Sequence, residues 1–158
     1  MDKPDDRPQD PFRAFLPNYR WDGVPFLPYK EEGLAPFKSV TRQILFHEPA
    51  LGCELRYFEV APGGHSTLER HEHVHAVMIL RGAADVLVGR EVRAVDTFDL
   101  VHIPPMTWHQ FRTRGDEPMG FLCMVNAERD RPQLPGEDDL RRMRSEPAVA
   151  AFLGSGEP

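Results

Sequence analysis

The stretch Glu69-Arg-His-Glu-His-Val-His75 decides how this chain is interpreted, because three histidines and two glutamates fall within seven residues. An apolar run from Ala76 to Leu80 follows at once and ends at Arg81-Gly82. Six of the seven histidines lie between His65 and His109. Neutral imidazole is the commonest protein ligand for transition metals, and carboxylate often accompanies it. The stretch is therefore a candidate metal site, with a pH-responsive patch or a solvated turn as the alternatives.

Outward from this stretch, the chain between residues 39 and 126 has the pattern of short strands separated by Gly and Pro turns. Two of these strands, 67–71 and 75–80, are expected to pair across a tight turn. Many short, evenly spaced strands predict an all-β sandwich or barrel. The expected strands are 39–46, 54–60, 67–71, 75–80, 84–88, 91–95, 100–103, 108–113 and 120–126.

The two ends of the chain differ in character from the strand-rich centre. Residues 1–36 carry seven of the sixteen prolines together with many aromatic residues. This composition predicts an irregular arm with a disordered tip at 1–10, packed on the barrel or on a second subunit; a solvated tail is the alternative. Residues 37–127 are expected to form the barrel. Residues 128–158 are expected to add a loop and short helices that pack on it.

Length, charge and cysteine content limit the possible functions. A chain of 158 residues is expected to form one domain, and its net charge of −6 disfavours nucleic acid as a partner. The start of the chain has no apolar core typical of a secretory signal, and no apolar run is long enough for a membrane span. Cys53 and Cys123 lie in strand-like surroundings, which favours buried free thiols in a reducing cytoplasm over a disulfide, and their lack of CxxC spacing disfavours a structural zinc site. We therefore expect a cytoplasmic protein with a small-molecule partner.

The spacing around the histidine stretch resembles the first motif of the cupin superfamily, in its small single-domain form. That motif is Gly, five residues, His-x-His, three or four residues, Glu, six residues, Gly. Here Gly63, five residues, Glu69-Arg-His71, three residues, His75, six residues and Gly82 occupy those places without a gap. The resemblance implies an all-β, cupin-type double-stranded β-helix, which is a jelly-roll barrel.

The second cupin motif, Gly-Asp, a short strand, Pro-x-Gly, two residues and His, is matched by Phe98-Asp99, Pro104-Pro105-Met106 and His109. Phe98 and Met106 therefore stand where the family carries glycine. In the first motif a glutamate replaces a histidine and a histidine replaces the glutamate. These departures leave open a barrel that kept the fold and lost the metal.

Two ligand sets follow from two ways of aligning the motif. The ungapped frame gives Glu69, His71, His75 and His109. The alternate frame uses His71 and His73 as the His-x-His pair, with His75 or nothing as the fourth ligand. Residues two apart on a strand point to one face, so either set can aim at one point inside a barrel. The resemblance implies one divalent transition metal per chain, with Fe(II) favoured and Mn, Ni, Cu or Zn possible.

The resemblance implies a function by analogy with the family. We expect a dioxygenase-type oxidoreductase acting on a small organic substrate, with Glu69 or Glu72 accepting a proton if it is not a ligand. A metal-dependent isomerase, lyase or decarboxylase and a non-catalytic binding or sensing cupin are the alternatives. Arg56 and Arg81 are possible anchors for a carboxylate, although exposed strand ends are expected for both. A homodimer is expected from the family. The expected pocket residues are Tyr57, Val77, Ile79, Thr107, Phe111, Phe121 and Cys123.

Overall fold

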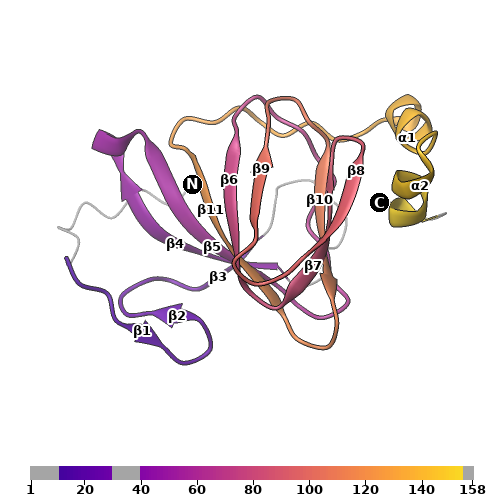
Figure 1. Cartoon of the computed structure of the whole chain (residues 1–158). Coiled ribbons are helices and arrows are strands. Elements are labelled where there is room, and N and C mark those ends of the chain that lie inside the picture. Colours follow the sequence, from indigo (N-terminus) through magenta and orange to yellow (C-terminus); the bar gives the residue numbers. More distant parts are fainter. Residues whose placement is uncertain (1–10, 30–39, 155–158) are drawn as a thin grey trace.

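The computed structural model describes residues 11–29 and 40–154 and confirms the predicted all-β fold. Eight strands form its body, and two short helices follow them (Figure 1). The strands are β4 (Val40–Glu48), β5 (Cys53–Val60), β6 (His75–Arg81), β7 (Ala83–Val88), β8 (Glu91–Val95), β9 (Leu100–Ile103), β10 (His109–Arg114) and β11 (Met119–Asn126). A single 3-10 turn, Pro49–Leu51, joins β4 to β5.

The strands form two antiparallel sheets with the hydrophobic core between them. The larger sheet has the order β3-β4-β5-β11-β6-β9, in which β3 is the short strand Leu27–Pro28, and the smaller has the order β10-β7-β8. One buried cluster contains residues of both sheets, including Ile79 and Phe121 of the larger sheet and Val86 and Phe111 of the smaller one. The Phe111 and Phe121 rings stack with centroids 4.8 Å apart, which joins the two sheets. This arrangement is the jelly-roll architecture that the motifs predict.

Alternation along β6 determines which side chains enter the barrel. His75, Val77 and Ile79 are buried, whereas Ala76 and Met78 between them are exposed. Successive side chains of a strand point to opposite faces, so a histidine at the start of this alternation must face inward. The sequence of β6 thus fixes the direction of a candidate ligand.

The N-terminal arm lies on the outer face of the larger sheet. It contains β1 (Phe15–Leu16), β2 (Arg20–Trp21) and β3 (Leu27–Pro28). Tyr19 and Trp21 both contact the Tyr57 ring, with centroids 5.9 and 5.2 Å away. The Gln43 side-chain amide donates to the Tyr19 carbonyl at 2.7 Å. The arm therefore packs on the barrel over residues 11–29, whereas the predicted disordered tip at 1–10 lies outside the described residues.

The segment before β6 differs from the expectation. Residues 67–71 do not pair with 75–80, and this prediction is wrong. Both edges of β6 are already occupied, by β11 on one side and β9 on the other. The segment instead lies along β10, where His65 is bridged to Arg112 and Glu69 to His109. As a result, Glu69 and His109 become direct neighbours.

Several turns in this fold have the left-handed backbone that favours glycine. Gly82 and Gly89 have φ of 66° and 64°, and a side chain at Gly82 would also collide with the Pro118 carbonyl oxygen. Phe98 and Met106 adopt φ of 74° and 53° although they carry side chains. These are the two positions where the cupin motif has glycine, so the backbone of the motif is retained while its residue type is not.

The C-terminal helices cover one side of the barrel (Figure 1). These are α1 (Glu137–Met143) and α2 (Pro147–Leu153). Met143, Val149 and Leu153 are buried in a second hydrophobic cluster with Leu68 and Leu87. Within the described residues no helix is long and apolar enough to cross a membrane.

Candidate metal centre and its cavity

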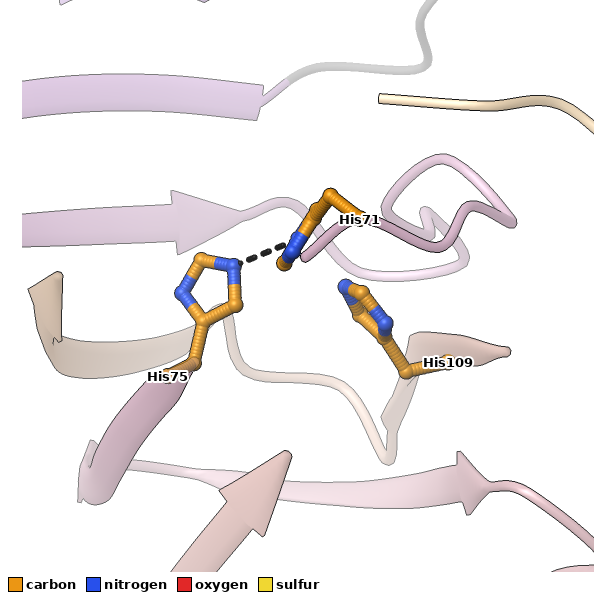
Figure 2. A group of neighbouring side chains, drawn as sticks. All are labelled: His71, His75 and His109. Carbon is orange, nitrogen blue, oxygen red and sulfur yellow. Dashed lines mark hydrogen bonds between the residues drawn. The ribbon is translucent and has the colours of Figure 1, made fainter. Parts of the chain in front are cut away.

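Three buried histidines meet inside the barrel. One ring nitrogen from each of His71, His75 and His109 lies within 4.8 Å of the others. Figure 2 shows the three rings converging from separate parts of the chain. The Nε2 atoms of His71 and His75 are 2.8 Å apart. Two nitrogens about 2.1 Å from one ion and at right angles are about 3.0 Å apart, so this spacing suits cis ligands of a transition metal.

The backbone holds the histidine cluster in place. Glu69 and His109 exchange two backbone hydrogen bonds, of 3.2 and 3.0 Å. The Met106 amide donates to the His71 carbonyl at 2.7 Å, which ties the proline turn to the histidine segment. His75 is fixed by the β6 ladder. The cluster is therefore assembled by three independent elements of the fold.

Hydrogen bonds to carbonyl groups set the tautomers of two histidines. Nδ1 of His71 donates to the His73 carbonyl at 2.7 Å, and Nδ1 of His109 donates to the Thr107 carbonyl at 2.9 Å. A carbonyl can only accept, so in the neutral rings the Nε2 atoms carry lone pairs that point into the cluster. Carbonyl partners of this kind orient metal-binding histidines.

Burial keeps the imidazoles neutral. It lowers the pKa of His75 to about 2, and the neighbouring His109 and His71 lower it further. Burial likewise lowers the pKa of His109 to about 4, against the hydrogen bond to Thr107. The pKa of His71 is lowered by the same cause. Neutral imidazole is the form that binds metal, so all three rings are ready to do so at neutral pH.

Glu69 completes the ligand set of the ungapped frame. Its Oε1 lies 3.9 Å from Nε2 of both His71 and His109. The structure thus places a Glu69 oxygen beside two of the three clustered histidines, as the ungapped frame predicts. Three imidazoles and one carboxylate fit a divalent transition metal and contain no thiolate that would favour a closed zinc site.

His73, the ligand of the alternate frame, occupies a different position. Its ring stacks on His71 with centroids 3.6 Å apart, and its Nδ1 lies 2.7 Å from Oδ1 of Asp130. His71, His73 and Asp130 form a second group with metal-ligand spacing. Glu72, expected as a possible proton acceptor, is exposed and lies outside the cavity, so that role is not supported. It falls at the tip of the turn, where its amide bonds Asp130 at 2.8 Å.

A cavity of about 190 Å³ opens beside the cluster and is lined by residues of both sheets. Four of the expected pocket residues line it: Val77, Phe111, Phe121 and Cys123.

Tyr57, Ile79 and Thr107, also expected in the pocket, do not line the cavity. Tyr57 faces outward beneath the N-terminal arm, and its neighbour Phe58 lines the cavity instead. Ile79 belongs to the buried core further along β6. The side-chain hydroxyl of Thr107 donates to the Pro105 carbonyl. Thr107 contributes to the site through its backbone carbonyl, which accepts from Nδ1 of His109.

Cys123 lies beside the histidines on the neighbouring strand. Its Sγ is 2.7 Å from Nδ1 of His75, and the side chain is buried. Burial raises the pKa of this thiol to about 11, although the adjacent Arg56 guanidinium opposes the shift. Both cysteines are free, as predicted, but Cys53 is only partly buried. Cys123 therefore combines a wall position with direct contact to a candidate ligand.

Charged residues that the sequence did not single out also line the cavity. They are Arg42, Arg129 and Asp130. Arg56, expected to be exposed, is only 5% exposed and lines the same cavity. The signal for Arg56 was its inward parity with Phe58 on β5. Arg129 and Asp130 lie in a loop where no periodicity indicates direction.

Comparison with known proteins agrees with the fold. The family described as "Cupin domain" matches residues 56–125. A protein of Rhodospirillum rubrum, named 1-methylthio-D-xylulose 5-phosphate methylsulfurylase, is 64% identical over 152 residues, which is 96% of each chain. The chain belongs to the cupin family. The cupin fold that the sequence motifs implied is therefore confirmed.

Two crystal structures are similar to this cupin over most of its length. A cupin 2 conserved barrel domain protein from Rhodopseudomonas palustris is 57% identical with a TM-score of 0.83, covering 89% of this chain and 97% of that one. A cupin-2 domain from Rhodospirillum rubrum is 64% identical with a TM-score of 0.81, covering 91% and 97%. The fold is therefore shared with these proteins over most of the chain.

Proposed function

We propose that this cupin transfers the methylthio group of a 1-methylthio ketose phosphate to a thiol, with Cys123 as the first acceptor. One observation carries the proposal: a buried thiol lies in the same cavity as the three-histidine cluster and 2.7 Å from His75 Nδ1. The name of the 64% identical relative supports the reaction class and the substrate. A sulfur-transfer enzyme needs a sulfur nucleophile, and Cys123 is the cysteine that lines this cavity.

The first step exchanges one bond to sulfur for another. The Cys123 thiolate attacks the methylthio sulfur, an S–S bond forms, and the bond between that sulfur and C1 of the ketose breaks. The electron pair remains on C1, where it is conjugated with the C2 carbonyl, and C1 then takes up a proton. The products are a 1-deoxy ketose phosphate and a methyl disulfide on Cys123.

The histidines place the reacting groups. With Nε2 of His75 bound to the metal, the proton of this ring would stand at Nδ1 and donate to the Cys123 thiolate. His71, His75, His109 and Glu69 would hold a divalent transition metal, and the bound metal would supply Lewis-acid polarisation of the ketose carbonyl. The apolar wall, including Phe111 and Phe121, excludes water from the thiol.

A second thiol completes the cycle. A low-molecular-weight thiol attacks the disulfide at the methylthio sulfur, takes the methylthio group and restores the Cys123 thiol. The overall reaction converts methylthio ketose phosphate and one thiol into deoxy ketose phosphate and one mixed methyl disulfide. No oxygen is consumed in this balance.

The dioxygenase reaction expected from the sequence has no specific support in the site. A histidine-rich site with one carboxylate suits oxygen chemistry as well as Lewis-acid chemistry. The thiol beside His75 and the name of the relative both favour sulfur transfer. We therefore prefer methylthio transfer and expect no oxygen uptake with this substrate.

Mass spectrometry of the protein tests the proposal. Metal-loaded protein mixed with 1-methylthio-D-xylulose 5-phosphate, without added thiol, should gain one CH₃S group in place of one hydrogen, located on Cys123. Added dithiothreitol should remove it. A Cys53→Ser variant should behave as wild type, because Cys53 does not line the cavity. Turnover by Cys123→Ser at the wild-type rate would disprove the role of Cys123.

A further inference from the structure

Three arginine side chains gather at one end of the same cavity. Arg42 comes from β4, Arg56 from β5, and Arg129 from the loop after β11. Arg56 is 5% exposed. The Nε atoms of Arg42 and Arg56 are buried without a hydrogen-bond partner in the described part of the chain. Buried donors without partners usually belong to a ligand-binding site or carry a large cost.

The carboxylates nearby do not balance these cations. Glu54 Oε1 lies 3.7 Å from Arg56 Nε and 3.6 Å from an Arg129 amino group, so one carboxylate faces two guanidinium groups. The other oxygen of Glu54 is bonded by His47 at 3.1 Å. Among interactions of the described residues, Arg42 meets only the Tyr29 ring, 5.4 Å from its guanidinium carbon.

The two acids that line the cavity face elsewhere. Glu69 lies against the histidine cluster, and Asp130 is bonded to two amides and the His73 ring. Burial and the nearby Arg56 lower the pKa of Arg129, with Arg42 adding to the effect. The cluster therefore holds more positive than negative charge, although the whole chain has a net charge of −6. An anion would relieve this imbalance.

The sheet register places the arginines in line with the reacting groups. Arg56 pairs directly with Cys123 across β5 and β11, and Cys123 pairs with Val77 on β6, the strand of His75. Neighbouring strands are about 4.8 Å apart, so Arg56 and His75 stand on strands about 10 Å apart. Cys123 lies on the strand between them. A ligand can thus place an anionic group at the arginines while its other end lies at the thiol and the histidines.

We propose that Arg42, Arg56 and Arg129 form the phosphate-binding end of the cavity, which takes the phosphomonoester dianion of the substrate. The guanidinium fork suits phosphate oxygens, and the arginines set the orientation of the ligand. The phosphate lies at this arginine cluster, the carbonyl lies at the histidines, and the methylthio sulfur lies at Cys123. The identity of the ketose rests on the proposed function, whereas the anion site rests on the arginines alone.

Binding of inorganic phosphate to the metal-loaded protein, measured by calorimetry, tests the anion site without turnover. Arg42→Met and Arg129→Met should each weaken binding about tenfold or more, as expected for loss of a charge-assisted hydrogen bond. Arg93→Met is the matched control, since Arg93 is exposed and pairs with Glu91 outside the cavity. It should bind within twofold of wild type. Acetate should bind more weakly than phosphate. Three results would overturn the proposal: acetate that binds as tightly as phosphate, wild type that does not bind phosphate, or equal losses of binding in all three variants.

A measurement on the wild-type protein covers the case in which a variant fails to fold. Phosphate should slow phenylglyoxal modification of Arg42 and Arg129, followed by peptide mass spectrometry, and leave that of Arg93 unchanged. Equal modification of Arg42 and Arg129 with and without phosphate would also overturn the proposal. Arg56 is not replaced in this test, because it lies against Glu54. Its removal would leave the buried Glu54 carboxylate with less positive charge beside it and would destabilise the fold.

Turnover separates this inference from the proposed function. For wild type, kcat/KM should be about 100-fold or more higher for the phosphorylated methylthio ketose than for the same ketose without phosphate. In Arg42→Met this ratio between the two substrates should be about tenfold smaller. Turnover with an unchanged ratio in the variant would refute the phosphate site alone. Phosphate binding that depends on Arg42 without any turnover of the methylthio ketose would refute the proposed function and leave the anion site standing.

Discussion

Asp130 should stabilise the turn between His71 and His75 although it lies well outside the motif. Its carboxylate accepts hydrogen bonds from the Glu72 amide at 2.8 Å, the His73 amide at 3.1 Å and the His73 ring at 2.7 Å. The turn between His71 and His75 is thus closed by a residue from the loop after β11. Its replacement by alanine removes all three acceptor contacts at once.

The size of the effect follows from the exposure of the carboxylate. Hydrogen bonds to charged groups contribute about 1.5–3 kcal/mol each when buried. The Asp130 side chain is 31% exposed, so water replaces part of what is lost. We therefore expect Asp130→Ala to cost about 2 kcal/mol in total, or about 4–8 °C in Tm for a domain of this size. Because the turn positions His71, metal affinity should fall about 10- to 100-fold.

The pH dependence gives an independent check. Partial burial works against ionisation of Asp130, but hydrogen bonds from the Glu72 amide and from His73 outweigh it and hold the pKa below its usual range. A depressed carboxyl pKa contributes stability above the unfolded value of about 3.9, and this stability is lost as the pH falls toward the folded value. The difference in stability between wild type and variant should therefore be full at pH 7 and shrink below pH about 4.

Thermal unfolding and metal titration of Asp130→Ala test the prediction. The matched control is Asp138→Ala, which removes an exposed carboxylate paired with Arg141 and should change stability by less than about 0.5 kcal/mol. An Asp130→Ala variant with wild-type Tm and wild-type metal affinity would refute the account of this turn.

Three further predictions concern the ligand set, the backbone and the oligomer. Glu69→Ala should lower metal affinity at least about tenfold and far more than His73→Ala, measured by competition with a chelator; the reverse order would favour the alternate frame. Gly82→Ala should lower the free energy of unfolding by about 2–4 kcal/mol in chemical denaturation, because φ is 66° and the new side chain meets the Pro118 carbonyl. Gly89→Ala, with φ of 64° and more room, should lower it by about 1 kcal/mol. Equal losses in the two variants would contradict the steric account. Light scattering should give a dimer of about twice 18.0 kDa, and Leu100→Asp, on the exposed outer face of the larger sheet, should yield monomers; a monomeric wild type would end this expectation.

The strands were predictable because their physics is local. Alternation along β6 fixes the inward direction of His75, and turns at Gly and Pro separate the strands. The segment 67–71 was misplaced because its partner was not a local choice. Only the complete sheet order shows that β11 and β9 occupy both edges of β6.

The candidate site was partly predictable for the same reason. The motif spacing singled out Glu69, His71, His75 and His109 before any coordinates, and the fold brings them together. The position of Tyr57 could not be deduced in this way, because the N-terminal arm that covers it is irregular in sequence. Pockets are made by contacts between distant segments, which a single-sequence pattern does not contain.

The metal content of the purified protein tests the central claim most directly. Protein prepared without chelator and reconstituted with Mn(II), Fe(II), Co(II), Ni(II) or Zn(II) should hold about one ion per chain by elemental analysis. His75→Ala and His109→Ala should hold far less, and His47→Ala, outside the cluster, should match wild type. A wild-type protein that neither contains nor takes up a stoichiometric metal, or a His75→Ala variant that retains it fully, would contradict the account.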